Sequence, residues 1–197
     1  MIAPYEGVVM DVGTGDGRFV SSRAREYPNK YVIGVDANAK PLQKLSIRAT
    51  RKPSKGGLPN AMFVQAAVES LPEEFAGVAR EIHVNFPWGS LLRAVAVGDA
   101  DVLASLRVVA RDGSMLNVVI GIDPERDRAE LERLGIAALS LDSVRCNLLP
   151  RYEAAGFENI ECRELEPEEW SGFSTSWAKR LSGNESRQVF LLRFQAI

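Results

Sequence analysis

The sequence has little of the chemistry on which metalloproteins and secreted domains depend. Among its 197 residues are two cysteines, Cys146 and Cys162, and one histidine, His83. The cysteines lack CxxC spacing and have no histidine cluster near them, so neither a zinc site nor a disulfide scaffold is indicated. We expect reduced thiols and no bound metal.

Long apolar runs are also missing. No stretch approaches the roughly 18 residues that a membrane-spanning helix needs, and the N-terminal MIAPYEG has no basic start followed by an apolar segment. These absences predict a soluble, cytoplasmic protein without a membrane partner. With 46% apolar residues the chain can bury a substantial core, and its length fits a single domain over residues 1–197.

An excess of one charge sign is absent overall but present locally. The formal net charge is -2, so the whole molecule has no general attraction for nucleic acid. Residues 37–68 nevertheless contain six basic side chains and no acid. Lys40, Lys44, Arg48 and Arg51 have helical spacing and would line one helix face. Such a stripe is often only a solvated face, but without compensating acids it favours a phosphate-binding surface.

Strand and helix patterns alternate along most of the chain, which predicts a mostly parallel α/β sheet with helices on both faces. The final two strands are joined by a polar linker without a strong helix, so the last strand is expected to run antiparallel. The predicted strands are 7–12, 31–36, 61–66, 80–86, 114–121, 158–164 and 188–195, and the predicted helices are 17–27, 39–52, 99–111, 125–134 and 142–155.

The strongest local signal is the segment VVMDVGTGDGRF at 8–19. A strand ends near Asp11, and Gly13, Gly15 and Gly17 allow positive φ and a close approach of the backbone to a ligand. The third glycine comes one residue early for the G-x-G-x-x-G of NAD enzymes. The segment instead resembles the first motif of class I S-adenosylmethionine (SAM) methyltransferases, in which this loop underlies the methionine part of the cofactor.

Two further elements strengthen the expectation of SAM binding. Asp36 ends the next predicted strand. It lies at the spacing, ~20 residues downstream of the glycine loop, at which an acid accepts hydrogen bonds from ribose hydroxyls. In AAVESLP at 66–72, Val68 and Glu69 match the positions that contact the adenine ring of SAM in this class. Each piece alone has an ordinary explanation, since Asp36 could cap the next helix and Glu69 could be a first-turn helix acid.

The segment NFPWG, residues 85–89, follows the fourth predicted strand at the edge where open α/β sheets bind ligands. It resembles the Asn-Pro-Pro-Tyr motif of amino-methylating enzymes, with Trp88 in place of the tyrosine. An aromatic side chain there can stack on a flipped nucleobase, and core packing is the alternative role. His83 lies inside an apolar strand, where we expect a core or supporting residue.

Several motifs together resemble the Kam-type aminoglycoside-resistance methyltransferases: DVGTGDGR, KPSKGGLPN at 52–60, FPWGSLLR at 86–93, PRYEAAGF at 150–157, and LEPEEW with STSWAKRL at 165–181. Those enzymes methylate ring nitrogen N1 of adenine 1408 in 16S rRNA within the assembled 30S subunit, with SAM as cofactor. The resemblance implies this activity, aminoglycoside resistance, and a class I fold with seven strands and an antiparallel last strand. We expect substrate-recognition linkers near 122–150 and 165–187 and a monomeric protein.

The resemblance also implies roles for individual residues. Trp88 and Trp177 would sandwich the flipped adenine, and Thr175 and Ser176 would help to close the site over cofactor and base. Contacts with rRNA would come from basic side chains, namely Arg51, Lys52, Lys55, Lys179, Arg180 and Arg187.

Two features depart from that family's pattern. Residues 1–6 precede the first predicted strand, where family members carry a hairpin extension, and Asn85 stands where other members tend to have an apolar residue. Asn85 motivates a second hypothesis, methylation of the exocyclic amine of adenine in another RNA or DNA. The missing hairpin motivates a third, a SAM-binding protein that docks on RNA without methylating it.

Overall fold

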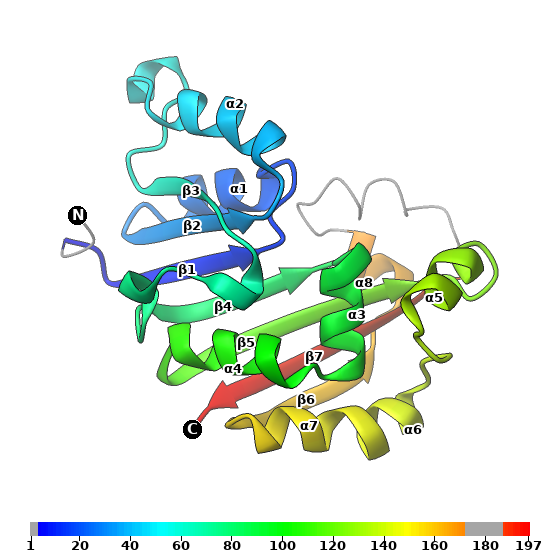
Figure 1. The fold of residues 1–197 in the computed structure, drawn as a ribbon. Coiled ribbons are helices and arrows are strands. Elements are labelled where there is room, and N and C mark those ends of the chain that lie inside the picture. Colours follow the sequence, from blue (N-terminus) through cyan, green and yellow to red (C-terminus); the bar gives the residue numbers. More distant parts are fainter. Residues whose placement is uncertain (1–3, 172–186) are drawn as a thin grey trace.

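A seven-stranded sheet organises the protein, which the computed structural model describes over residues 4–171 and 187–197 (Figure 1). The strand order is β3-β2-β1-β4-β5-β7-β6. Neighbours among β1 to β5 pair in parallel, whereas β7 runs antiparallel to both β5 and β6. The predicted sheet with an antiparallel last strand is therefore confirmed. The strands are β1 Gly7–Val12, β2 Lys30–Asp36, β3 Ala61–Gln65, β4 Ala79–Asn85, β5 Ala110–Ile122, β6 Phe157–Glu164 and β7 Gln188–Ala196.

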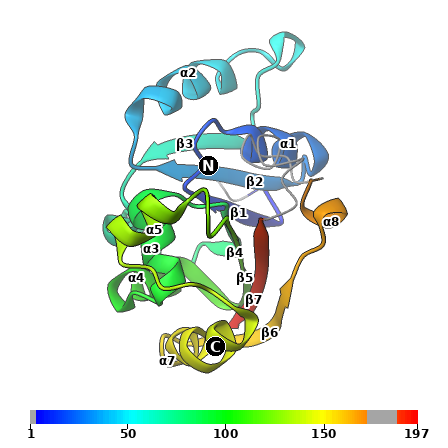
Figure 2. The ribbon, with the colours of Figure 1, turned by 90° about the vertical axis from the view of Figure 1, so that its right-hand side faces the viewer.

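Helices cover both faces of the sheet (Figure 2). On one face α1 and α2 bury a small apolar cluster that includes Val9, Val20 and Val32. On the other face α3, α4, α5 and α7 bury the larger core. The helices are α1 Arg18–Glu26, α2 Ala39–Ala49, α3 Gly89–Val97, α4 Ala100–Val109, α5 Arg128–Leu134, α6 Leu141–Ser143, α7 Leu149–Ala154 and α8 Pro167–Ser171.

Three segments differ from the predicted elements. Helix α3, with the sequence GSLLRAVAV, has no predicted counterpart, because periodicity alone does not separate a short apolar helix from a buried strand. The predicted helix 142–155 is divided by a π-helical turn, Val144–Leu148, just before Pro150, which has no N–H to continue the helical hydrogen bonds. Within the predicted linker 165–187, Pro167–Ser171 forms α8.

None of the helices in the described ranges has the length and apolarity to cross a bilayer. The same residues contain no cluster of three or more histidine, cysteine or acidic side chains that could hold a metal ion. Cys146 and Cys162 are free thiols.

Candidate functional site

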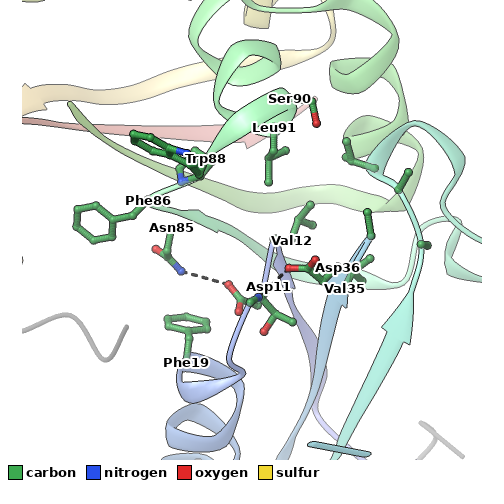
Figure 3. A pocket seen from close by; sticks show the side chains of 18 of the residues that line it. Asp11, Val12, Phe19, Val35, Asp36, Asn85, Phe86, Trp88, Ser90 and Leu91 are labelled. Carbon is green, nitrogen blue, oxygen red and sulfur yellow. Dashed lines mark hydrogen bonds between the residues drawn. The ribbon is translucent and has the colours of Figure 1, made fainter. Parts of the chain in front are cut away.

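A cavity of about 330 Å3 opens at the carboxyl ends of β1, β2 and β4 (Figure 3). Strand β2, which follows β1 in the chain, lies on one side of β1 in the sheet, and β4 lies on the other side. The cavity therefore lies at the point where the strand order reverses. Its volume lies at the small end of the range for ligand pockets. Among the described residues, the lining contains four acids and no basic residue, and the acids are Asp11, Asp16, Asp36 and Glu69.

The glycine loop forms one wall of this cavity. Gly13 and Gly15 line it with φ values of 79° and 52°, which favour glycine. Gly17 has a φ of 65° and lies outside the lining. A Cβ atom on Gly17 would stand 2.6 Å from Leu45 and 2.8 Å from Phe63. Gly17 therefore allows close packing of the start of α1, while the first two glycines face the ligand space.

Asp36 holds the glycine loop in place and also faces the cavity. Its Oδ2 accepts a hydrogen bond of 2.8 Å from the Gly15 N–H, and its Oδ1 accepts one of 2.8 Å from the Asn38 N–H. The cap of α2 is Asn38, whose side chain accepts from the Lys40 N–H. The alternative explanation that Asp36 caps this helix therefore does not describe the structure.

Asp11 and Asn85 form a buried pair at the base of the cavity. Asn85 Nδ2 donates to Asp11 Oδ1 across 3.3 Å, and both residues are less than a tenth exposed. Burial raises the pKa of Asp11 to about 6, against the opposing effect of Thr14 and Asn85 beside it. The Asn85 Oδ1 is buried with no hydrogen-bond partner among the described residues. Sequence reasoning named both residues but did not find their contact.

Val68 and Glu69 lie in a short 3-10 turn, Val68–Ser70, that follows β3. Both line the cavity, on the side of Asp36. Val68 is buried in the larger core, and Glu69 is exposed at the rim. The structure therefore places both predicted residues beside the carboxylate at the end of β2.

Trp88 lies at the rim of the cavity, immediately before α3, with 39% of its surface exposed. Figure 3 shows it above Asn85, with Leu91 and Ser90 following on α3. Sequence reasoning missed Ser90 and Leu91 as lining residues because it did not predict α3. It also missed Phe19, which enters the cavity from the first turn of α1.

His83 is a buried residue of β4 that does not line this cavity. Its ring lies 4.8 Å from that of Phe19, and Nε2 lies 3.5 Å from a carboxylate oxygen of Glu81. Burial lowers the pKa of His83, so the ring is neutral at pH 7. The expectation of a core or supporting residue agrees with this environment.

The basic residues divide into two groups. Arg51, Lys52 and Lys55 are exposed at the end of α2 and in the 3-10 turn Pro53–Lys55. Arg187 differs from its predicted role. Its side chain is 5% exposed, and its guanidinium donates to Asp127 Oδ2 at 2.8 Å and to the Gly121 carbonyl at 3.0 Å. In this structure Arg187 is half of a buried ion pair and presents no open phosphate-binding surface.

Five predicted site residues lie outside the described residues. They are Trp177, Thr175, Ser176, Lys179 and Arg180. The second half of the expected adenine sandwich therefore stays a prediction from the sequence.

The sheet order, the glycine loop and the carboxylate at the end of β2 together define the class I SAM-dependent methyltransferase fold. The chain belongs to the family described as "NpmA: 16S rRNA (adenine(1408)-N(1))-methyltransferase", which it matches over residues 1–196. The expected family resemblance is thereby confirmed.

Individual relatives agree with this membership. A 16S rRNA (adenine(1408)-N(1))-methyltransferase of Streptoalloteichus tenebrarius is 40% identical over 184 residues, which cover 93% of this chain and 84% of that protein. The enzyme of that name from Escherichia coli is 34% identical over 194 residues, which cover 96% of this chain and 87% of that protein.

Solved structures agree as well. The aminoglycoside resistance methyltransferase NpmB1 has 47% identity and a TM-score of 0.86, covering 100% of this chain and 90% of that one. A second structure is a variant of the 16S rRNA (adenine(1408)-N(1))-methyltransferase from Catenulisporales acidiphilia, solved with cosubstrate SAM. It has 37% identity and a TM-score of 0.90, and the match covers 99% of this chain and 88% of that one.

Proposed function

We propose that this protein uses SAM to methylate ring nitrogen N1 of adenine 1408 in 16S rRNA, within the assembled 30S subunit, and thereby confers aminoglycoside resistance. The observation that carries the proposal is the exposed indole of Trp88 at the rim of an acidic cavity at the sheet's switch point. A base stacked on this indole would stand directly beside the cavity. Family membership supplies the identity of the rRNA position.

The charge of the cavity fits SAM better than a nucleotide phosphate. SAM supplies a methyl group on a positively charged sulfonium, next to an ammonium group and ribose hydroxyls. In the part of the chain that the structure describes, the lining offers four carboxylates and no basic residue, a charge that attracts a cation and repels phosphate. Asp36 would accept from the ribose hydroxyls, Gly13 and Gly15 would lie against the methionine part, and Val68 and Glu69 would contact the adenine ring.

The chain's own contribution to the chemistry is alignment. Once adenine is unpaired, its N1 lone pair points outward and is not protonated at neutral pH, so no residue has to act as a general base. The only histidine lies outside the cavity lining. Stacking on Trp88, with roughly 1–3 kcal/mol per aromatic face, offsets the cost of flipping the base. Holding the reacting groups in line can contribute up to ~7–11 kcal/mol.

Docking on rRNA would use the basic surface formed by α2 and the turn Pro53–Lys55. The side chains of Lys40, Lys44, Arg48, Arg51, Lys52 and Lys55 have no ion-pair partner among the described residues. Helix α2 begins just after Asp36, which lines the cavity, so the surface extends from the site itself. We propose that the protein acts as a monomer without a metal ion.

Reverse transcription across 16S rRNA tests the proposal. Small subunits are incubated with the protein and SAM, and the rRNA is extracted and copied. Methylation of N1 blocks the pairing edge, so the polymerase should stop at position 1408 only when both protein and SAM were present. Subunits incubated without SAM, and naked 16S rRNA, are the controls, and the naked rRNA tests whether the assembled subunit is required.

Asn85 favours one second candidate, methylation of the exocyclic amine of adenine. Its buried Oδ1 has no partner in the described residues and could accept from that amine. Methylation of the amine usually lets the polymerase pass. Methyl incorporation from labelled SAM without a stop at 1408 would support this candidate, and no incorporation would support a docking protein without activity.

A further inference from the structure

Phe86 has a backbone conformation that its residue type does not favour. Its φ is 48°, the only positive φ of a non-glycine residue within 4–171 and 187–197. Pro87 follows, and a residue before proline is normally restricted to extended backbone with negative φ. A strained residue of this kind persists only where its surroundings hold it. The turn that carries Trp88 to the cavity therefore depends on the packing of Phe86.

The ring of Phe86 is held between two elements. It is 4% exposed and lies over Gly121 of β5, where a Cβ atom would stand 2.8 Å from its Cδ1. The ring of Trp170 meets it edge to face, with centroids 6.5 Å apart and an interplanar angle of 63°. The Phe86 N–H donates to the Val119 carbonyl at 2.8 Å. Figure 3 shows the Phe86 ring directed away from Asp36.

Trp170 is fixed independently of the cavity. The N–H of Leu165, just before α8, donates to the Val189 carbonyl of β7 at 2.7 Å. Within α8, Glu169 pairs with Arg163 at 2.9 Å. Trp170 itself is 2% exposed, and its Nε1 has no hydrogen-bond partner among the described residues. Its ring rather than its polar atom therefore accounts for its burial against Phe86.

We infer that Trp170 is a positioning residue for methyl transfer, which packs against Phe86 and thereby holds Trp88 at the rim of the cavity. The inference rests on the proposed function. Trp170 is not among the residues that line the cavity, so it acts through the Phe86–Pro87–Trp88 turn and not on the cofactor. Loss of its ring would let Phe86 relax toward negative φ and move Trp88.

Single-turnover and steady-state methylation of small subunits test this role. Trp170→Leu should lower kcat at least tenfold, while KM for subunits and the Kd for SAM change less than threefold. Trp170→Phe should remain within threefold of wild type, because it keeps an aromatic edge and loses no hydrogen bond to the described residues. Gly121→Ala should also lower kcat, because the new Cβ would stand 2.8 Å from Cδ1 of Phe86 and displace the ring.

A double variant tests whether the effect passes through Phe86. If it does, Trp170→Leu combined with Phe86→Leu should lose no more than the larger single loss; losses that multiply would overturn the inference. Phe157→Leu is the matched control, since Phe157 is a fully buried aromatic residue that packs on Phe194 away from the cavity. It should lower thermal stability with kcat retained. A Trp170→Leu protein with wild-type kcat would also overturn the inference.

A fluorescence measurement needs no activity and separates this inference from the proposed function. With Trp177→Phe as background, Trp170→Phe and Trp170→Leu each leave Trp88 as the only tryptophan. Acrylamide quenching of Trp88 should be clearly stronger in the Leu variant, since the turn is released. Equal quenching would overturn the inference even if wild type is inactive. An inactive wild type with unequal quenching would overturn only the proposed function. If Trp170→Leu does not fold, Trp170 and Trp177 are both replaced by Phe, and quenching of Trp88 is compared with and without Gly121→Ala.

Discussion

Asn85 donates a hydrogen bond to Asp11 where β4 and β1 end side by side. Asp11 pairs in register with His83, and Asn85 lies two residues farther along β4, so the two side chains share the face covered by α1. Asn85 opposes the effect of burial, which raises the Asp11 pKa to about 6. Asn85, the first residue of the NFPWG segment, thus influences the charge of the cavity.

SAM affinity is expected to fall as the pH is lowered through about 6, because protonation of Asp11 removes negative charge from a site for a cation. Calorimetry between about pH 5 and pH 8 would measure the loss, which approaches tenfold per unit below the pKa if binding requires the ionised form. Asn85→Leu should move the midpoint to higher pH. An affinity that stays constant over this range would contradict the assignment.

The same carboxylate should make the ligand-free protein more stable in mild acid. The pKa of Asp11 in the folded state, about 6, lies above the ordinary value of 3.8, so the folded state binds more protons between these two pH values. The free energy of unfolding therefore rises as pH falls from about 6 toward 4, by on the order of 2–3 kcal/mol at most. Asp11→Asn should remove this dependence and raise the melting temperature at pH 7, while it weakens SAM binding. Thermal unfolding of both proteins checks this.

Removal of the Asp36 carboxylate should weaken SAM binding at least tenfold. A lost charged hydrogen-bond acceptor typically costs about 1.5–3 kcal/mol. Because Asp36 also accepts from the Gly15 and Asn38 N–H groups, Asp36→Ala should loosen the glycine loop as well. Asp36→Asn keeps one acceptor and separates the two effects. Unchanged SAM affinity of the Ala variant in calorimetry would defeat the site.

Affinity for small subunits should fall steeply with salt, whereas SAM affinity should barely change. Charge reversal at Arg51, Lys52 and Lys55 should lower subunit affinity and reduce the salt dependence. For a matched control, reversal of the pair Lys52 and Lys55 is compared with reversal of the pair Arg80 and Arg111, which are exposed near the amino ends of β4 and β5, at the edge opposite the cavity. Equal losses from both sets would indicate only a general effect of net charge.

Trp88→Ala should lower methylation of small subunits tenfold or more, since each ~1.4 kcal/mol of barrier changes the rate tenfold. SAM binding and docking should be nearly intact, and Trp88→Phe should restore much of the activity because it keeps a π face. We expect the same of Trp177→Ala and Trp177→Phe. Wild-type methylation rates in both Ala variants would exclude the adenine sandwich. A loss of activity that arises only because the variants unfold would exclude it as well.

Arg187→Ala should destabilise the protein by roughly 3–5 kcal/mol, because it leaves Asp127 buried without its partner. Denaturant unfolding would measure this, and the double variant Arg187→Met with Asp127→Leu should recover part of the loss. If Arg187 also contacts rRNA, the stable double variant should still bind subunits less tightly. Wild-type subunit affinity in that variant would restrict Arg187 to a structural role.

The sheet and the cofactor loop could be predicted from the sequence, because both depend on local patterns. Continuous apolar strands, the G-x-G-x-G turn and Asp36 at a strand end each depend on residues close together in the chain. The family resemblance added Trp88 from the NFPWG segment. Helix α3 has no predicted counterpart, because its short apolar run is compatible with either a helix or a buried strand.

Contacts between side chains far apart in the sequence follow from the tertiary structure. The pairing of Asp11 with Asn85 follows from the order β1-β4 in the sheet, which no sequence spacing encodes. The family resemblance implies an RNA contact for Arg187, whose charge is visible in the sequence, whereas its burial against Asp127, 60 residues away, depends on the antiparallel β5–β7 pairing. Charge is a property of a residue, but solvent exposure and partners are properties of the fold.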